Sequence, residues 1–372
     1  MKITGVEAIE LRLPDSYAGP RLILRQTLII KVHTDEGIVG FGEVDSSPSV
    51  VRAAVDAPLR NSPISGLGQV IMGQNPLEIR RLNDLMYQAT FDYGRGGVVQ
   101  HAIGGIDIAL WDIAGKYYNQ PVYRLLGGPL QTRIPAYAST LFGGNGKETA
   151  AEGKKWVSKG FTSVKFGWHP MGQSEKLDLE LVEGARQGIG DKCNLMIDAG
   201  CCWDTATAIK RAQQFEDYHL YWLEEPLARD NIDGYRQLTN VSRIPIAGGE
   251  GEAGRYAFRN LIERGGIHIA QIELVRNGIT ESMRIADMAE DRGLKVVNHH
   301  WASDINLAAS LHFLSARKST FILEYCVADS PLRWEVTRKK IGIDAKGYVS
   351  VPDGPGLGIE LNEETVARYR VD

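Results

Sequence analysis

Long apolar runs are missing from this sequence of 372 residues. No stretch approaches the ~20 consecutive apolar residues that a membrane-spanning helix requires. The N-terminal segment MKITGVEAIELRL also lacks the apolar core of a signal peptide, because its polar and apolar residues alternate as in a β-strand. We therefore expect a cytoplasmic protein without a membrane partner.

Basic residues are not in excess either. The chain has 42 Lys and Arg against 46 Asp and Glu, a formal net charge of −4, so it lacks the positive surface that binds nucleic acid. Cysteine is scarce: Cys193, Cys201, Cys202 and Cys326 match no metal-site spacing, and adjacent cysteines do not readily form a normal disulfide. We expect four free, reduced thiols.

Three regions differ in their sequence pattern. Residues 1 to about 50 alternate like a β-meander, with a turn at Asp35-Glu36-Gly37. Residues 51–127 carry small and apolar residues at helical spacing and end at the breaker Gly127-Gly128-Pro129. We expect a first α+β domain at 1–127, a second domain at 128–335, and a Gly/Pro-rich tail at 336–372 that returns to the first domain.

The second region alternates between short apolar strands and amphipathic helices. Eight strands are expected at IPAYAST, TSVKF, LMIDAG, YWLEEP, IPIAGGE, IAQIEL, KVVNHH and FILEY. Strands that alternate with helices predict a parallel sheet, and eight of them predict closure into an α/β barrel of the TIM type.

Polar side chains close most of these strands. They are Lys165, Asp198, Glu224, Glu250, Glu273, His299 and Glu324. From Asp198 onward they recur about every 25 residues, the length of one strand–helix unit, so they should meet at one end of the barrel, where active sites lie. Helix N-capping would explain one or two acidic residues after strands, but it does not explain six at this spacing.

Three of the carboxylates come from successive strands. Asp198, Glu224 and Glu250 would repel one another in one cavity unless a cation held them. Ligands that are all oxygen favour a hard ion, and Mg²⁺ keeps positions open for water and substrate. Glu225 faces the other way along its strand and is expected in a supporting contact. Glu252 is a weaker alternative to Glu250 because it lies past the strand end.

His299 closes the seventh strand and is the candidate acid–base group, because imidazole exchanges protons near neutral pH. Glu273 ends the neighbouring strand, where its carboxylate could orient the ring. His300 points the other way and is expected to be structural, and His312 is expected to pack within a helix. For His169, which follows the second strand, both a loop position and a substrate contact stay open.

The chain resembles the enolase superfamily, and within it the mandelate racemase subgroup, over nearly its whole length. The motifs that carry the resemblance are GIDIALWDIAGK, MIDAG, WLEEP, AGGE, VNHHW and DGPGLGIE. The resemblance implies a (β/α)7β modified TIM barrel under an α+β capping domain, which the N-terminal region and the C-terminal tail form. It also implies abstraction of the proton α to a carboxylate, one Mg²⁺ per subunit on the three carboxylates, and a dimer-based homo-oligomer, for example an octamer.

The resemblance assigns roles to the remaining polar residues at the strand ends. His299 matches the family's base, Glu273 its partner, and Glu324 an acid that hydrogen-bonds the developing enediolate. Lys165 matches the first lysine of a Lys-x-Lys motif and would bind or polarise the substrate carboxylate. The alternative for Lys165 is a structural salt bridge to Glu324 or to another carboxylate at the strand ends.

Two departures from the family pattern affect the expected chemistry. Glu273 stands where the subgroup usually has Asp, and the segment ELVRNGIT is one residue shorter than usual, which leaves its alignment open. Gly167 stands where racemases have the second lysine of the motif, their opposite-face base. Without it, the sequence favours a one-base reaction over a two-base exchange.

We expect a Mg²⁺-dependent acid-sugar dehydratase that gives a 2-keto-3-deoxy acid. The alternatives are a racemase, epimerase or lactone cycloisomerase on the same scaffold, with His169 as a second base, and a non-catalytic relic that binds sugar acids. The small-molecule substrate would be an aldonate or aldarate. Its expected contacts in the capping domain are Tyr17, Arg21, Arg25 and the segment from Asp45 to Ser47, including Ser46. Ordinary surface charge is the alternative for the two arginines.

Overall fold

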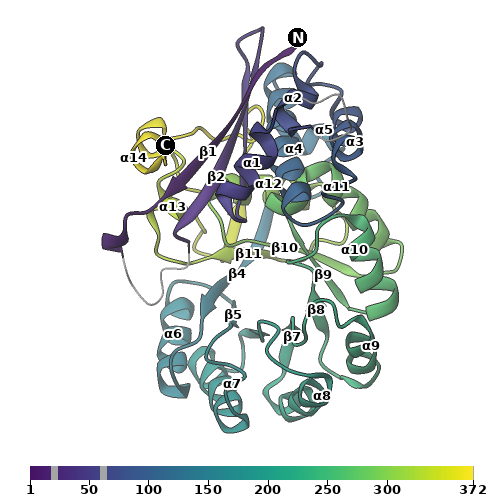
Figure 1. Ribbon diagram of the computed structural model, residues 1–372. Coiled ribbons are helices and arrows are strands. Elements are labelled where there is room, and N and C mark those ends of the chain that lie inside the picture. Colours follow the sequence, from purple (N-terminus) through teal and green to yellow (C-terminus); the bar gives the residue numbers. More distant parts are fainter. Residues whose placement is uncertain (18–23, 59–64, 372) are drawn as a thin grey trace.

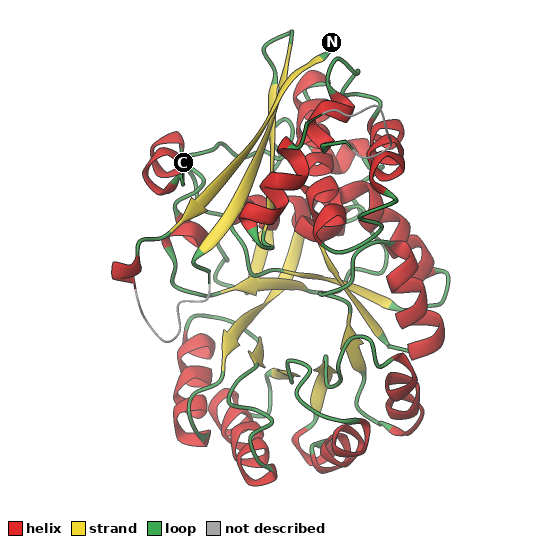
Figure 2. Cartoon of the chain, viewed as in Figure 1, coloured by secondary structure: helices red, strands yellow, loops and turns green. Residues whose placement is uncertain are grey.

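The computed structural model describes residues 1–17, 24–58 and 65–371. It shows a parallel barrel with an antiparallel sheet and a group of helices above it (Figure 1, Figure 2). Within the described ranges, no helix combines the length and apolar character needed to cross a membrane.

The N-terminal region begins with an antiparallel meander. Its strands are β1 (Ile3–Arg12), β2 (Gln26–Thr34) and β3 (Val39–Val44), paired in that order. The predicted turn between β2 and β3 is confirmed, and Gly37 adopts a positive φ of 77° there. Glycine tolerates this conformation because it has no Cβ.

Helices α1 (Pro48–Asp56), α2 (Leu67–Ile71), α3 (Ile79–Thr90), α4 (Val98–Tyr117) and α5 (Val122–Leu125) follow the meander. A glycine of β3 lets this strand pack closely against α4. A Cβ on Gly42 of β3 would lie 2.1 Å from the carbonyl oxygen of Gly105, so only glycine lets the strand lie this close to the helix. This contact fixes β3, and with it the loop that enters the barrel region.

The barrel contains the eight predicted parallel strands. They are β4 (Arg133–Leu141), β5 (Ser163–Gly167), β6 (Asn194–Asp198), β7 (Leu220–Glu224), β8 (Ile246–Gly248), β9 (Ile269–Glu273), β10 (Lys295–His299) and β11 (Leu323–Cys326). They are hydrogen-bonded in the order β10-β9-β8-β7-β6-β5-β4-β11. The expected modified barrel fold is confirmed.

The barrel is nearly closed between β10 and β11. Among the described residues these two strands share no strand ladder, but the Asn298 side chain joins them. Its Nδ2 donates to the Glu324 carbonyl at 3.3 Å, and its Oδ1 accepts from the Glu324 amide at 2.8 Å. This contact holds β11 at Glu324 beside the end of β10, which brings Glu324 to the same rim as His299.

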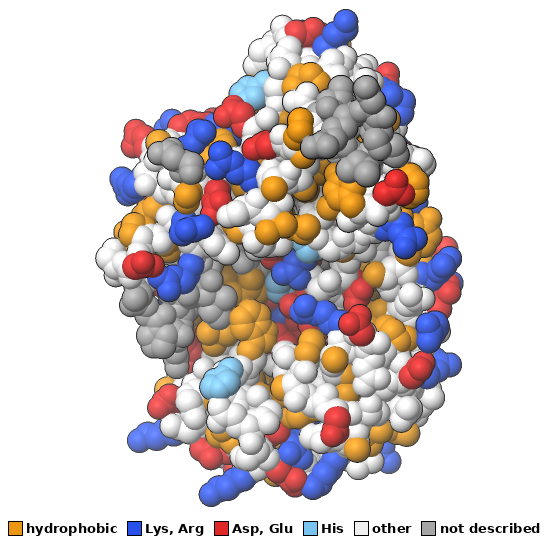
Figure 3. Space-filling model, viewed as in Figure 1, with side chains coloured by type: hydrophobic (Ala, Val, Ile, Leu, Met, Phe, Trp, Pro, Cys, Tyr) orange, Lys and Arg blue, Asp and Glu red, His pale blue; other side chains and the backbone are white. Residues whose placement is uncertain are grey.

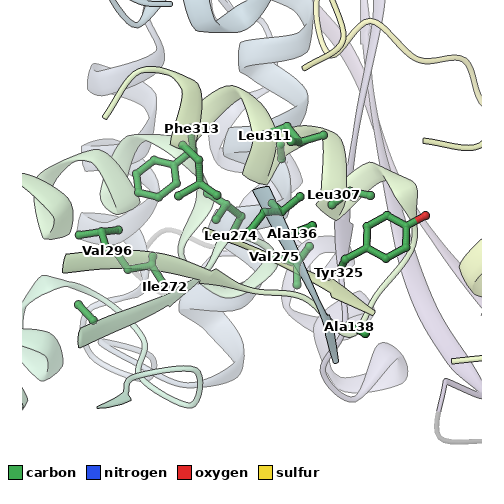
Figure 4. Close-up of a cluster of buried hydrophobic side chains, with 14 of the residues drawn as sticks. Ala136, Ala138, Ile272, Leu274, Val275, Val296, Leu307, Leu311, Phe313 and Tyr325 are labelled. Atoms are coloured by element: carbon green, nitrogen blue, oxygen red, sulfur yellow. The ribbon is translucent and has the colours of Figure 1, made fainter. Parts of the chain in front are cut away.

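Helices cover the outside of the barrel. They are α6 (Gly146–Ser158), α7 (Glu175–Ile189), α8 (Thr205–Gln214), α9 (Ile232–Val241), α10 (Arg255–Arg259), α11 (Leu274–Glu290), α12 (Asp304–Ser315) and α13 (Pro331–Trp334). Apolar side chains of α12, such as Leu307 and Leu311, pack with residues from the strands in one large core (Figure 4). Inside the barrel, Tyr137 and Trp222 fill the space below the rim.

The C-terminal tail contacts both parts of the molecule. Strand β12 (Tyr348–Ser350) pairs antiparallel with the start of β4. Beyond it, α14 (Glu363–Tyr369) leads back to β1, where the amide of Val371 donates to the carbonyl of Glu10 at 2.9 Å. The expected return of the tail is therefore seen at its end, while the domain limits themselves stay predictions.

Candidate active site

Seven polar residues predicted from the strand ends lie buried at one rim of the barrel. They are Lys165, Asp198, Glu224, Glu250, Glu273, His299 and Glu324. The ladders explain part of this convergence, because Asp198 pairs in register with Glu224 and Glu273 with His299. Neighbours at the ends of parallel strands point into the same space.

Asp198, Glu224 and Glu250 form a compact group of carboxylates. One oxygen of each lies within 4.8 Å of the others. Burial, followed by the charges of Glu224 and Glu250, raises the pKa of Asp198 well above its usual value. Oε2 of Glu250 is buried and accepts no well-aligned hydrogen bond from the described residues. Crowded, oxygen-only donors of this kind fit a hard divalent cation such as Mg²⁺.

Two tryptophans orient the carboxylate group. Trp168 Nε1 donates to Oδ2 of Asp198 at 2.6 Å, and Trp222 Nε1 donates to Oε2 of Glu224 at 2.9 Å. An indole N–H can only donate, so each ring fixes one carboxylate oxygen. The other oxygen of Asp198 accepts from the amide of Gly200 at 2.8 Å, and that of Glu224 faces Lys165. Such outer contacts typically hold metal ligands in place.

Arg229 supports the group from the loop after β7. It donates to both oxygens of Glu225, and its NH2 group lies 2.9 Å from Oε1 of Glu250. Glu225 thus makes the supporting contact expected of it. Glu252 falls outside the three-carboxylate group, and burial raises its pKa to about 7.

Lys165 lies between two carboxylates in the barrel interior. Its Nζ is 2.5 Å from Oε1 of Glu224 and 2.8 Å from Oε1 of Glu324. Burial alone would lower the pKa of Lys165, but the two carboxylates raise it well above its usual value, so the amine is charged. The structure therefore shows the ion pair that the alternative interpretation predicted, and a contact of Lys165 with substrate stays a proposal.

His299 forms a dyad with Glu273. Nδ1 of the ring lies 2.5 Å from Oε2 of Glu273, and Nε2 lies 3.1 Å from Oε2 of Glu250. Burial opposes the charged ring, but the charges of Glu250 and Glu324 and the bond to Glu273 raise the pKa of His299 to about 10. The ring thus has one nitrogen held by an acid and the other directed at the carboxylate group.

The shortened segment after β9 does not displace Glu273. Helix α11 begins at Leu274, directly after the strand, and the chain kinks at Gly278, where φ is 70°. Glu273 therefore keeps its place at the end of β9, beside His299. The other two predicted histidine positions are also seen: His300 Nδ1 accepts from the amide of Cys326, and His312 stacks on Tyr123.

A cavity of about 630 Å³ opens beside this group. Its lining includes Trp168, His169, Cys201, Cys202, Arg229 and Glu250. Figure 3 shows acidic and basic side chains gathered in a hollow between the barrel and the region above it. His169 is exposed at the cavity, and its Nε2 lies 2.6 Å from Nε2 of Gln173. A Cβ on Gly167 would lie 3.1 Å from Oδ2 of Asp198, so this position faces the three-carboxylate group.

The predicted substrate contacts of the N-terminal region do not form one cluster. Arg21 lies outside the described residues. Tyr17 is exposed and its hydroxyl lies 3.3 Å from that of Tyr369, while Arg25 lies 3.6 Å from Asp15. These contacts tie Tyr17 to the C-terminal helix and Arg25 to its own loop.

Ser46 and Asp45 lie closer to the barrel rim. Ser46 Oγ is 2.6 Å from Nδ1 of His101, and Asp45 binds Arg276 through two hydrogen bonds. Arg276 also donates to the carbonyl of Glu250 at 2.7 Å. Asp45 therefore links the N-terminal region to a residue of the carboxylate group.

Sequence reasoning missed several residues that hold the site together. Trp222 could have been found, because it precedes Glu224 by two positions and therefore shares its face of the strand. Arg229 could also have been found, because it follows Glu225 by four positions in the sequence, a spacing that permits a local ion pair. Asn306 also holds the site, because its Nδ2 donates to Oε1 of Glu273 at 2.8 Å. Arg276 and Asn306 gave no signal, because their partners lie far away in the sequence.

Comparisons with known proteins agree with this geometry. Residues 8–127 match the family model for the mandelate racemase / muconate lactonizing enzyme N-terminal domain, and residues 148–365 match the enolase C-terminal domain-like model. A D-galactonate dehydratase of Pectobacterium atrosepticum is 33% identical over 98% of this chain and 94% of its own length.

Two cycloisomerases are also similar. A D-galactarolactone cycloisomerase of Agrobacterium fabrum is 31% identical, covering 100% of this chain and 99% of that protein. The crystal structure of the 3,6-anhydro-D-galactonate cycloisomerase from Zobellia galactanivorans is 31% identical, with a TM-score of 0.90 and complete coverage of both chains. The matches to the two family models, together with these similarities over the full length of the chain, show that the chain belongs to the mandelate racemase / muconate lactonizing enzyme family of the enolase superfamily.

Proposed function

We propose that this protein is a Mg²⁺-dependent acid-sugar dehydratase. The observation that supports it most directly is the arrangement of His299, whose Nδ1 is held by Glu273 while its Nε2 faces Oε2 of Glu250 at 3.1 Å. A base so placed reaches a substrate bound beside the three carboxylates. Gly167, at the end of β5, offers no opposing base.

Asp198, Glu224 and Glu250 would hold the Mg²⁺. When bound, the ion would supply positive charge that stabilises negative charge on the substrate carboxylate as the α-proton leaves. The buried, oxygen-only donor set supports this assignment.

The chain's own residues would move the protons. A cation held by Glu250 would offset the charge that most raises the pKa of His299, so the ring would become neutral. Nε2 of His299 then takes the proton from the carbon α to the carboxylate, and Glu273 stabilises the resulting imidazolium. The electron pair of the broken C–H bond then forms a double bond to the β-carbon, and the β-hydroxyl leaves as water with the proton that His299 returns. The enol product takes up a proton at C3 to become a 2-keto-3-deoxy acid.

Lys165 and Glu324 would stabilise the negative charge that develops on the substrate carboxylate. Lys165 keeps its positive charge because Glu224 and Glu324 surround it. A fixed ammonium in a buried site acts without reorganisation when charge develops nearby. Glu324 lies at the same rim. Burial would raise its pKa, but the charges of Lys165 and His299 lower it, so Glu324 would have to take up a proton before it donated a hydrogen bond to the substrate.

A lactone cycloisomerase is the second candidate, because two similar proteins are named as cycloisomerases. Both reactions begin with a proton abstracted from a sugar acid, and they differ in the bond that breaks next. A non-catalytic relic is disfavoured by the retention of the carboxylate group, the lysine and the histidine dyad. Homo-oligomer formation stays a prediction.

A substrate panel separates these functions. D-galactonate, arabinonate, xylonate, D-galactarolactone and 3,6-anhydro-D-galactonate would each be incubated with the protein and Mg²⁺, and the products identified by NMR. We expect a 2-keto-3-deoxy acid from at least one open-chain aldonate and none from the His299→Asn variant. Ring opening of a lactone or anhydro sugar without water loss from any aldonate would instead identify a cycloisomerase.

A further inference from the structure

Glu43 is a buried carboxylate at the boundary between the N-terminal region and the barrel. It lies on β3, with no exposed surface, and accepts a hydrogen bond from Oγ1 of Thr27 on β2 at 2.8 Å. From the barrel side it accepts bonds from the amide of Ser303 at 3.1 Å, the hydroxyl of Ser303 at 2.7 Å and the amide of Asn306 at 3.2 Å. A strand of one region thus holds the first turn of a helix in the other.

The helix that Glu43 contacts is α12, which begins five residues after His299. Ser303 is its N-cap residue, and its Oγ also accepts from the amide of Ile305 at 3.1 Å. The first amides of a helix have no partner within the helix and carry partial positive charge, so a carboxylate is favoured there. Glu43 therefore fixes both the position and the direction of the start of α12.

The same first turn contacts the catalytic dyad. Nδ2 of Asn306 donates to Oε1 of Glu273 at 2.8 Å, and the other oxygen of Glu273 lies 2.5 Å from Nδ1 of His299. Oδ1 of Asn306 accepts from Ser310 at 3.3 Å, which sets the direction of its amide group. A continuous path of hydrogen bonds thus leads from Glu43 through Asn306 and Glu273 to His299.

We infer that Glu43 is a positioning residue for His299. By fixing the first turn of α12, it sets the place of Asn306, which holds Glu273 in the orientation that aligns the ring. The inference rests on the proposed function in one respect, namely that His299 is the base. According to this inference, the N-terminal region helps to align His299, in addition to any contact that it makes with substrate.

A purely structural role explains Glu43 less well. Burial raises the pKa of Glu43 to about 7 even though four hydrogen-bond donors lower it, so the acid is costly to bury. The two regions are also joined elsewhere. Asp107 of α4 accepts from the amide of Thr280 at 2.8 Å, and Trp111 Nε1 donates to the hydroxyl of Thr280 at 2.9 Å. Docking of the two regions therefore does not depend on Glu43 alone.

The test compares Glu43→Gln with Asp107→Asn in the full-length protein containing Mg²⁺. Both variants replace a buried carboxylate by its amide at the same boundary, but only Glu43 is linked to Glu273. Proton–nitrogen NMR on protein with isotope-labelled histidine would follow the Nδ1–H resonance of His299, assigned by its loss in His299→Asn. Asn306→Ala serves as the second variant, which removes the next link in the path and leaves Glu43 intact.

We expect the His299 resonance to move in Glu43→Gln and Asn306→Ala toward its position in Glu273→Gln, and to stay in place in Asp107→Asn. For a substrate that is turned over, kcat should fall about tenfold or more with little change in KM, the range typical of residues that orient a functional group. An unmoved resonance in Glu43→Gln overturns the inference, and so does an equal shift in Asp107→Asn. If no sugar acid is turned over, the proposed function fails, while the resonance still decides the role of Glu43.

Discussion

Oε2 of Glu273 lies 2.5 Å from Nδ1 of His299, and both residues end neighbouring parallel strands in direct register. The ladder between β9 and β10 sets this distance, so the dyad depends on strand geometry and not on a flexible loop. The second oxygen of Glu273 accepts from Val275 at 3.2 Å and from Asn306 at 2.8 Å. Each atom of the carboxylate therefore has a defined partner.

Replacing Glu273 by glutamine should weaken the base without loss of metal. Glu273→Gln keeps the size of the side chain but removes the charge that stabilises the protonated ring, so kcat should fall on the order of 10²-fold. The Mg²⁺ dissociation constant, measured by titration calorimetry, should stay nearly unchanged. An unaffected kcat would show that another residue orients His299.

Loss of one carboxylate should weaken Mg²⁺ binding. In Glu224→Gln and Glu250→Gln the affinity should fall at least about tenfold, because a neutral amide replaces a charged ligand in a set of three. Glu252→Gln is the matched control, since Glu252 lies in the same loop as Glu250 but outside the group. Titration calorimetry would measure all three variants. Wild-type affinity in both Glu224→Gln and Glu250→Gln, or a loss in Glu252→Gln alone, would contradict the ligand assignment.

Lys165 should stabilise the fold as well as the reaction. Its side chain is buried between Glu224 and Glu324, so Lys165→Met leaves two carboxylates facing each other without a cation. Removing one partner of a buried ion pair typically costs ~3–5 kcal/mol. Chemical denaturation of the metal-free protein should show a loss of this order, while Lys192→Met, at an exposed position, should show almost none. Equal stability of the two variants would mean that the carboxylates are neutral in the folded protein.

Asp107 should make stability depend on pH. Its carboxylate is fully buried, and burial raises its pKa from 3.8 to about 6. The folded protein thus holds this proton to higher pH than the unfolded chain, so the stabilisation is complete below pH 3.8 and is lost as the pH rises through about 6.

Asp107→Asn should remove this dependence. As the pH rises from 3.8 to about 6, the free energy of unfolding of the wild type should fall relative to that of the variant. The change should be on the order of 3 kcal/mol, because one pKa unit corresponds to about 1.36 kcal/mol. Denaturant unfolding at a series of pH values measures this difference, with Asp191→Asn at an exposed position as the control. A constant difference across the range would show that Asp107 is ionised throughout in the folded state.

The sequence predicted what repeats along the chain and missed what joins distant segments. Strand alternation and the regular spacing after Asp198 predicted the barrel and the rim residues, because those features repeat with the strand–helix unit. The contact of Asn306 with Glu273 and that of Arg276 with Asp45 could not be predicted, since tertiary packing alone brings these pairs together. For Lys165 the sequence left two interpretations open, and the fold shows the ion pair.

Gly167 offers the most direct test of a one-base reaction. A Cβ at this position would lie 3.1 Å from Oδ2 of Asp198, so the position where racemases have a second lysine adjoins the three-carboxylate group and carries no side chain. His169 is the remaining candidate for a second base, and its exposed ring lies against Gln173. With His299 alone able to reach the α-carbon, that proton should leave from one face of the substrate.

Turnover of a sugar acid in D₂O should therefore give a keto acid that carries deuterium at C3, where the enol takes up solvent hydrogen, while the remaining substrate shows no C2 epimer by NMR. His299→Asn should abolish both water loss and any exchange at C2, because no other base reaches the α-proton. His169→Ala is the control and should leave water loss intact, since the ring is exposed and its Nε2 contacts Gln173. Accumulation of a C2 epimer without keto acid, lost in His169→Ala, would identify a second base beyond the glycine and make the protein an epimerase.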